Sequence, residues 1–451
     1  MNPLQETLNQ FSSKNCIIEV FGLGYVGFPL SLHLASGGLN VIGIDTNLER
    51  ITRLNQNKLM ESELNLSREF EKSRKNQNLI FSDKPKQTDT SKIGIICVPT
   101  PIGKNSVDSN IYVFSAVENF LSTCKTGDLI ILESSIEVGT TDKIKKLIEK
   151  KGFEVGKNFG LCFCPERIDP QNKKWNLKNI PRVIYCSDEF SYEIAKKLYS
   201  YINNSNLFRV NNAKIAEVVK SYENAFRLVN ISLVNELAVL CDKLEINVSD
   251  VINAAATKPF GFMPFYTGSG VGGHCIPKDP TFLSEASKKF GIEFKTIENA
   301  LEINSFMPKY VVNSIDNLLD ELKLEKSVIV CGLSYKPDIE DMRDSPGFKI
   351  LNEFQKKQFK VAGYDPFFKM ELFDKYLIEN NLLNKKFEIL EDLSNEKIKN
   401  FNCICVVQHH TEIELKINEI YKNSFIPLIY DCQNKMKKLE KATTILKSLG
   451  S

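Results

Sequence analysis

This sequence of 451 residues contains few histidines, a single tryptophan and almost no excess of charge. It contains four histidines and one tryptophan, and 58 basic side chains against 56 acidic ones leave a formal net charge of +2. No histidine stands at a spacing typical of a zinc site, so we predict no metal. A nearly neutral chain also lacks the field that would attract nucleic acid or a membrane surface.

Long apolar runs are scarce too. We find none that reaches the length of a membrane span, and the first residues lack the apolar centre of a signal peptide, so we expect a cytoplasmic protein. Twelve cysteines are scattered along the chain. Several stand in apolar, strand-like runs, as Cys97 and Cys331 do. That placement favours reduced, buried thiols over a disulfide framework.

Short β-rich runs alternate with helical stretches in the first half of the chain and again after about residue 326. The expected strands are 17–21, 41–44, 92–98, 128–132, 327–331, 360–364, 402–407 and 427–430. Such alternation predicts parallel, doubly wound sheets. Between the two halves, apolar side chains recur every three or four residues from 213 to about 244 without Gly or Pro, which predicts one long helix.

The predicted fold class is therefore α/β, with two Rossmann-like doubly wound domains joined by a long central helix and a helical middle domain. We predict domains at 1–212, 213–315 and 316–451. The two halves share a local plan, because Asp45 and Asp365 each follow a strand, a turn, a helix and a second strand.

The first strand runs into a turn of the form G-x-G-x-x-G, made by Gly22, Leu23, Gly24, Tyr25, Val26 and Gly27. Its glycines suit a tight turn, the approach of a pyrophosphate and close packing of the next helix. Asp45, at the end of the next strand, would bond the ribose hydroxyls and repel a 2′-phosphate, so we predict NAD in preference to NADP. Arg50, just beyond, is either a further cofactor contact or a solvated charge.

A second glycine-rich stretch, GSGVGGHCIPKDP, occupies residues 268–280. We interpret its lack of side chains as clearing space for a substrate beside Cys275, with Lys278 and Asp279 able to tune the local charge. A buried structural cysteine is the alternative interpretation. With NAD, a cysteine nucleophile could capture an aldehyde as a thiohemiacetal, which a second oxidation turns into a thioester that water hydrolyses.

At this point the chain resembles the UDP-glucose/UDP-N-acetylhexosamine/GDP-mannose 6-dehydrogenase family along most of its length. The matching motifs are FGLGYVGFPL, CVPTP, ESSIEVGTT, CPERI, KSYENAFRLVNISLVNELA, GSGVGGHCIPKDP and GLSYKPDIEDMRDSP. The resemblance implies NAD-dependent oxidation of the C6 alcohol of a UDP-N-acetylhexosamine, either UDP-N-acetylmannosamine or UDP-N-acetylglucosamine. UDP-glucose is the alternative substrate. It also implies a homodimer formed through the central helix.

The resemblance further implies roles for single residues. Lys220 and Asn224, four apart on one helix face, would hold the oxyanion and a water. The other catalytic positions are Cys275 as nucleophile, Glu166 for proton transfer and hydrolysis, Asp279 and Ser135. The cofactor would also meet Pro99, Thr100, Ser134 and Arg343. The substrate would meet Arg167, Tyr266, Gly270, Gly272, His274, Tyr335 and Lys336.

Some positions depart from the family pattern, and other functions remain open. Thr267 and Ser269 stand where this branch usually has Pro, and Gln433 stands where many members have Arg. A single-step NAD alcohol or 3-hydroxy-acid dehydrogenase would need no nucleophilic cysteine. A catalytically inactive nucleotide-sugar-binding protein would tolerate the loss of catalytic residues, all of which are present.

Overall fold

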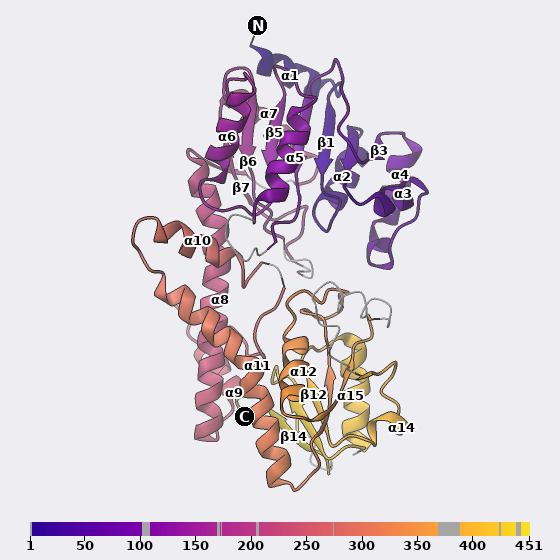
Figure 1. Cartoon of the computed structure of the whole chain (residues 1–451), viewed down its shortest axis with the longest axis vertical. Coiled ribbons are helices and arrows are strands. Elements are labelled where there is room, and N and C mark those ends of the chain that lie inside the picture. Colours follow the sequence, from indigo (N-terminus) through magenta and orange to yellow (C-terminus); the bar gives the residue numbers. More distant parts are fainter. Residues whose placement is uncertain are drawn as a thin grey trace. The chain divides into compact units, whose positions relative to one another are not determined.

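The computed structural model describes residues 2–101, 109–168, 172, 174–203, 207–273, 275–368, 388–423, 425–438 and 443–451. The chain forms two compact units (Figure 1). Unit 1 comprises Met1–Glu223 with Glu285–Ile292, and unit 2 comprises Asn224–Ser284 with Glu293–Ser451. The division into three domains that we drew from the sequence stays a prediction.

Unit 1 is built on one sheet of eight strands. They are β1 (Ile17–Phe21), β2 (Asn40–Ile44), β3 (Leu79–Ser82), β4 (Lys92–Ile96), β5 (Leu129–Leu132), β6 (Gly160–Phe163), β7 (Arg182–Cys186) and β8 (Leu207–Val210). Their order across the sheet is β3-β2-β1-β4-β5-β6-β7-β8, and each neighbouring pair is parallel except β6 with β7. Reversal of the strand order beside β1 creates the crevice in which doubly wound sheets bind ligands.

Helices cover both faces of this sheet (Figure 1). They are α1 (Pro3–Ser12), α2 (Gly27–Ser36), α3 (Leu48–Asn55), the 3₁₀ helix η1 (Glu61–Leu66), α4 (Ser67–Lys75), α5 (Ile111–Leu121), α6 (Thr140–Lys150) and α7 (Glu189–Ser200). Strand residues alternate between two cores. In β5, Leu129 and Ile131 join the core beneath α1, α2, α4 and α7, whereas Ile130 and Leu132 join the core beneath α5 and α6. Burial on both faces explains why these strands read as continuous apolar runs.

Unit 2 repeats the plan on a smaller scale. Its strands are β9 (Ser327–Cys331), β10 (Lys360–Tyr364), β11 (Glu388–Ile389), β12 (Cys403–Val406), β13 (Leu428–Asp431) and β14 (Ile445–Ser448), in the order β11-β10-β9-β12-β13-β14 and parallel throughout. Its helices are α9 (Val248–Ala255), α11 (Lys295–Glu321), α12 (Pro346–Lys356), α14 (Asn395–Ile398) and α15 (Thr411–Asn423), while α10 (Asp279–Lys288) begins in this unit. The predicted α/β class with two doubly wound sheets is confirmed.

The predicted central helix is α8 (Ala213–Leu244), and its bounds agree with the sequence pattern. Among the described residues it is the one helix long and apolar enough to cross a membrane by length and composition, contrary to our expectation that no segment would qualify. A core helix of a soluble protein passes the same test, so this is weak evidence for a membrane span.

The cysteines differ from expectation at one place. Cys162 on β6 lies opposite Cys186 on β7, with their Cα atoms 4.1 Å apart, and the two side chains form a disulfide. The antiparallel pairing of β6 and β7, which the sequence pattern did not predict, brings them together. The other ten cysteines lie outside the disulfide, as we predicted, although Cys275 is exposed and Cys97 and Cys124 are half-buried.

The turn after β9 offers a test of close backbone packing. Gly332 has φ +86°, and a Cβ there would lie 2.6 Å from backbone atoms of Gln408, whereas Gly261 has φ +66° with nothing within 4 Å. We expect Gly261→Ala to lower the free energy of unfolding by about 1 kcal/mol through backbone strain alone. Gly332→Ala should cost about 1–3 kcal/mol more, because backbone must shift. Urea titrations of both variants measure the difference, and equal costs would contradict this account.

Candidate active site

The turn after β1 has the geometry of a dinucleotide-binding turn. Gly22 has φ +89°, and a Cβ there would lie 2.7 Å from the carbonyl oxygen of Cys97. A Cβ on Gly27 would lie 1.9 Å from the carbonyl oxygen of Gly22. A Cβ on Gly24 would meet nothing within 4 Å. The first and third glycines are therefore required by the protein's own packing, and the second leaves open backbone that a pyrophosphate can approach.

Asp45 fixes this turn and retains capacity for a ligand. Its carboxylate accepts hydrogen bonds from the backbone N–H of Leu23 at 2.8 Å and of Asn47 at 2.9 Å. A carboxylate can accept about four hydrogen bonds, and Asp45 is only partly buried. The ribose hydroxyls of NAD therefore fit the remaining acceptor positions.

Arg50 is held by its own unit. Its Nη2 lies 2.6 Å from Oε1 of Glu63, and its guanidinium stacks over the Phe28 ring with a centroid distance of 5.1 Å. With 11% of its side chain exposed, Arg50 is not a solvated charge. Its predicted contact with the cofactor stays a prediction.

The other predicted cofactor residues of unit 1 follow β1, β4 and β5. Ser134 donates from Oγ to the carbonyl oxygens of Val98 at 2.7 Å and Ile96 at 3.2 Å, which ties the ends of β4 and β5 together. Thr100 is buried and Pro99 is exposed. Ser135 is half-buried, and Tyr25 in the glycine turn is 60% exposed. All of them lie at the carboxyl ends of parallel strands, where ligands of such sheets bind.

Glu166 is immobilised through both of its oxygens. Oε1 accepts from the backbone N–H of Arg167 at 2.6 Å and of Ile168 at 2.8 Å, and Oε2 lies 2.6 Å from Nη2 of Arg182. We did not identify Arg182 from the sequence. One signal in the sequence could have revealed it: Arg182 is a charged residue at the start of an apolar run. An arginine is almost never fully buried unless it is paired, so an acidic partner could have been expected.

Arg167 and α8 are linked within unit 1. The guanidinium of Arg167 makes two hydrogen bonds to Glu223 of α8, at 3.2 and 2.5 Å, and a third to the carbonyl oxygen of Pro181. Glu217, one turn before Lys220, accepts from the backbone N–H groups of Gly139 at 2.6 Å and Thr141 at 2.8 Å at the start of α6. Burial raises the pKa of Glu217. These contacts fix the rotation of α8, and with it the direction of Lys220.

In unit 2, three of the predicted catalytic residues are connected. Asn224 donates from Nδ2 to Oδ2 of Asp279 at 2.7 Å, and the backbone N–H of Asp279 donates to the carbonyl oxygen of Cys275 at 2.8 Å. Asp279 is 1% exposed, so its carboxylate is a buried partner for the amide. The sequence separation of 55 residues between Asn224 and Asp279 gave no sign of this bond.

Cys275 differs from every other cysteine of the chain, all twelve of which lie in the described part. It is an exposed thiol outside the disulfide, whereas the others are buried, half-buried or in the disulfide. Burial raises the pKa of Cys16, Cys124 and Cys164 to about 12. Because the thiolate is the nucleophile, these buried thiols are poor candidates for covalent chemistry.

The glycines before Cys275 are required by packing within unit 2. A Cβ on Gly272 would lie 2.5 Å from the carbonyl oxygen of Asp344, and one on Gly273 would lie 2.6 Å from the Tyr335 ring. Gly270 has φ +102°, and a Cβ there would lie 2.8 Å from the carbonyl oxygen of Asn304. A side chain at any of these three positions would therefore collide with the protein itself, and the substrate contacts predicted for Gly270 and Gly272 stay predictions. Gly268 alone of the four has nothing within 4 Å.

The remaining predicted residues lie in unit 2. Arg343 makes hydrogen bonds to both carboxylate oxygens of Asp341, and its side chain is half-exposed. The carbonyl oxygen of Tyr335, which precedes Lys336, accepts from Gln408, whose side chain accepts in turn from Gln433 at 2.8 Å. Tyr266 is 61% exposed. His274, which we predicted to meet the substrate, lies outside the described residues.

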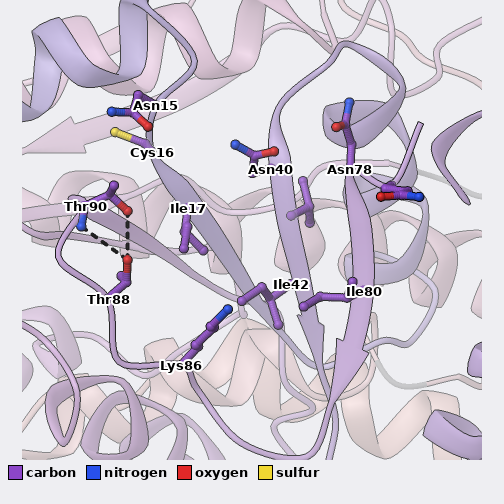
Figure 2. A pocket seen from close by; sticks show the side chains of 12 residues that line it. Asn15, Cys16, Ile17, Asn40, Ile42, Asn78, Ile80, Lys86, Thr88 and Thr90 are labelled. Atoms are coloured by element: carbon purple, nitrogen blue, oxygen red, sulfur yellow. Dashed lines mark hydrogen bonds between the residues drawn. The ribbon is translucent and has the colours of Figure 1, made fainter.

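A separate hollow lies at the amino ends of β1, β2 and β3, away from Asp45. Figure 2 shows Asn40, Asn78, Lys86, Thr88 and Thr90 around it, and its volume is about 300 Å³. It contains none of the predicted site residues. Among the described residues, no group of three histidine, cysteine or acidic side chains is arranged to hold a metal ion.

Comparison with protein families matches the chain in three consecutive stretches. The NAD-binding, central and UDP-binding domains of the UDP-glucose/GDP-mannose dehydrogenase family match residues 16–203, 214–306 and 329–438. A UDP-N-acetyl-D-mannosamine dehydrogenase of Methanococcus aeolicus is 35% identical over 406 residues, which cover 89% of this chain and 86% of the relative. A protein of the same name from Methanococcus vannielii is 34% identical over 431 residues, covering 93% and 92%.

Solved structures agree with these relatives. A UDP-D-ManNAc dehydrogenase from Pyrococcus horikoshii superposes with a TM-score of 0.82 at 29% identity and covers 96% of this chain and 99% of its own. A UDP-N-acetyl-mannosamine dehydrogenase from Staphylococcus aureus gives a TM-score of 0.81 at 29% identity, covering 96% and 98%.

The cofactor preference tests the role of Asp45. We expect kcat/KM with NAD to exceed that with NADP by about 100-fold or more, because a 2′-phosphate would meet repulsion where a charged hydrogen bond worth about 1.5–3 kcal/mol is available. Asp45→Asn should narrow this ratio, while Glu49→Gln, an exposed carboxylate on α3, should leave it unchanged. Initial rates with both cofactors decide the matter, and comparable efficiencies in the unsubstituted enzyme would refute the assignment.

Proposed function

The chain belongs to the UDP-glucose/GDP-mannose dehydrogenase family and is an NAD-dependent oxidoreductase that acts on a UDP-sugar, and from this premise we propose that it oxidises UDP-N-acetylmannosamine to the uronate. The names of the relatives support this sugar. UDP-N-acetylglucosamine is the near alternative, and UDP-glucose the further one. The observation that carries the chemistry is Cys275, an exposed thiol outside the disulfide whose carbonyl oxygen accepts a hydrogen bond from the backbone of Asp279.

The reaction consumes two molecules of NAD and one of water for each sugar. The C6 alcohol loses two hydrides to NAD, water supplies the second carboxylate oxygen, and three protons are released. Bound NAD supplies the hydride acceptor, for which the Gly24 backbone and Asp45 are the proposed holders. The remaining steps use side chains of the enzyme.

Cys275 is the proposed nucleophile. Its thiolate adds to the C6 aldehyde, and loss of the second hydride leaves a thioester on the sulfur. Lys220 and Asn224 donate to the oxygen that bears the developing charge, and Asp279 holds the amide of Asn224 in place. Glu166 accepts the proton of the water that attacks the thioester carbon. Ser135 supplies a further hydroxyl at the site.

The two other function classes make different demands. An alcohol dehydrogenase that transfers one hydride has no use for an exposed thiol, and it would release the aldehyde. An inactive sugar-binding protein would bind the nucleotide sugar without forming NADH. We further propose a three-part domain division at 1–212, 213–315 and 316–451, a cytoplasmic location, and a homodimer.

Two substitutions should stop the reaction at different points. Cys275→Ala should abolish acid formation and carry no adduct, because the acceptor of the aldehyde is lost. Glu166→Gln should slow turnover about 100-fold or more, while a substrate adduct accumulates on Cys275. Cys124→Ser, which alters a half-buried thiol, should behave as the unsubstituted enzyme. Intact-protein mass spectrometry after mixing with UDP-N-acetylmannosamine and NAD distinguishes these results. Uronate formation by Cys275→Ala at a near-normal rate would refute the mechanism.

The dimer prediction rests on α8. Tyr222, Phe226, Leu233 and Leu240 lie four or seven residues apart along this helix and are 45–63% exposed in the single chain. Such an apolar stripe suits a two-fold interface. Light scattering at micromolar concentration should show a dimer, and Leu233→Glu should shift it to monomer. Phe208→Glu, which alters an exposed aromatic on β8, should leave it dimeric. A monomer without any substitution would contradict the proposal.

A further inference from the structure

A fully buried arginine joins two carboxylates at the carboxyl edge of the unit 1 sheet. We infer that Arg182 is a positioning residue, which orients the Glu166 carboxylate for hydrolysis of the Cys275 thioester. The inference rests on the function proposed above and extends it to a residue that does not touch the substrate itself. All of its observations lie within unit 1.

The guanidinium is held on three sides. Nη2 lies 2.6 Å from Oε2 of Glu166, and Nη1 lies 3.4 Å from Oε1 of Glu133. The same Glu133 oxygen accepts from the hydroxyl of Tyr199 at 2.6 Å, and the Tyr199 ring lies 4.8 Å from the guanidinium carbon. Arg182 is 0% exposed, while the Glu166 side chain is 11% exposed. Of the two carboxylates, Glu166 is thus the one nearer solvent.

A buried ion pair is by itself weak evidence for a stabilising role. Burying an ion pair removes both groups from water, and replacing such a pair by apolar side chains is often neutral or stabilising. Here one guanidinium serves two acids. Nε of Arg182 and Oε2 of Glu133 have no hydrogen-bond partner among the described residues, although both atoms are buried. Burial raises the pKa of Glu133. Buried polar atoms that lack hydrogen bonds, together with an acid whose pKa is raised, are typical of functional sites.

The benefit falls on Glu166. The backbone N–H groups of Arg167 and Ile168 hold Oε1, and Arg182 holds Oε2, so that the side chain cannot rotate about its terminal bond. In the hydrolysis, the water oxygen bonds to the thioester carbon while a water proton passes to Glu166. The carbon–sulfur bond then breaks, and sulfur leaves as the Cys275 thiolate. A base that already points in one direction accelerates this step, because little entropy is lost when the carboxylate is aligned with the attacking water.

The test compares Arg182→Lys and Arg182→Gln with a control at Lys92. Lys92 forms an equally buried ion pair with Glu19 in the same sheet, and neither residue contacts Glu166. With UDP-N-acetylmannosamine and NAD, we expect Arg182→Gln to lower kcat about 10- to 100-fold with KM within about twofold. The substrate adduct should accumulate on Cys275, visible as intact mass. The kcat of Arg182→Lys should lie between that of Arg182→Gln and that of the unsubstituted enzyme, because an ammonium cannot donate to both carboxylates in the geometry of a guanidinium. Lys92→Gln should lower the melting temperature without an adduct.

Each outcome decides the inference. Folded Arg182 variants that turn over at the normal rate, or that lose activity without an adduct, would overturn it while leaving the proposed function intact. Absence of NADH formation by the unsubstituted enzyme with any UDP-sugar would overturn the proposed function, and this inference with it. If neither Arg182 variant folds, Glu133→Gln carries the test. It removes the carboxylate that holds the other end of the guanidinium, so kcat should fall while the substrate adduct accumulates on Cys275. A normal kcat without an adduct would then overturn the inference.

Discussion

Both units depend on a carboxylate at the end of the second strand that holds the turn after the first strand. In unit 1, Asp45 accepts from the backbone of Leu23 at 2.8 Å. In unit 2, Asp365 accepts from the backbone of Leu333 at 2.7 Å and of Ser334 at 2.9 Å. Each turn opens with a glycine at positive φ whose Cβ would strike the neighbouring strand end. Buried backbone donors need acceptors, and a carboxylate supplies several at one point.

The same device serves different ends in the two units. Asp45 is partly buried and has two backbone donors, which leaves acceptor capacity for a ribose. Asp365 is 3% exposed, and the same oxygen that holds the turn also accepts from the Ser334 hydroxyl and lies 3.1 Å from Nε2 of His410. The hydrogen-bond acceptor positions of Asp365 are therefore used by groups of the protein itself. Residues 334–345 precede α12, and among them Arg343 is exposed and Lys336 is half-buried.

The sequence predicted the parts of the fold that periodicity encodes. The strands 17–21, 327–331 and 360–364 have the observed bounds, and α8 spans 213–244 as expected. It did not predict β3, β6, β7, β8, β11 or β14, and of these β7 and β8 include arginines. The antiparallel pairing of β6 with β7, the Cys162–Cys186 disulfide and the role of Arg182 all follow from those strands. Composition also could not reveal that the glycines before Cys275 accommodate Asn304, Asp344 and Tyr335.

Buried charges separate structural from functional sites in unit 1. The Lys92 ammonium donates to Glu19, to the carbonyl oxygen of Lys86 and to the Thr123 hydroxyl, and the other Glu19 oxygen accepts from the backbone of Lys86. This pair is hydrogen-bonded throughout and so is explained by the fold alone. The Arg182 cluster has the same burial, yet Nε of Arg182 and Oε2 of Glu133 find no hydrogen-bond partner among the described residues. The hydrogen bond that Arg182 does make to Glu166 fixes the direction of that carboxylate, which is the geometry that the proposed positioning role requires.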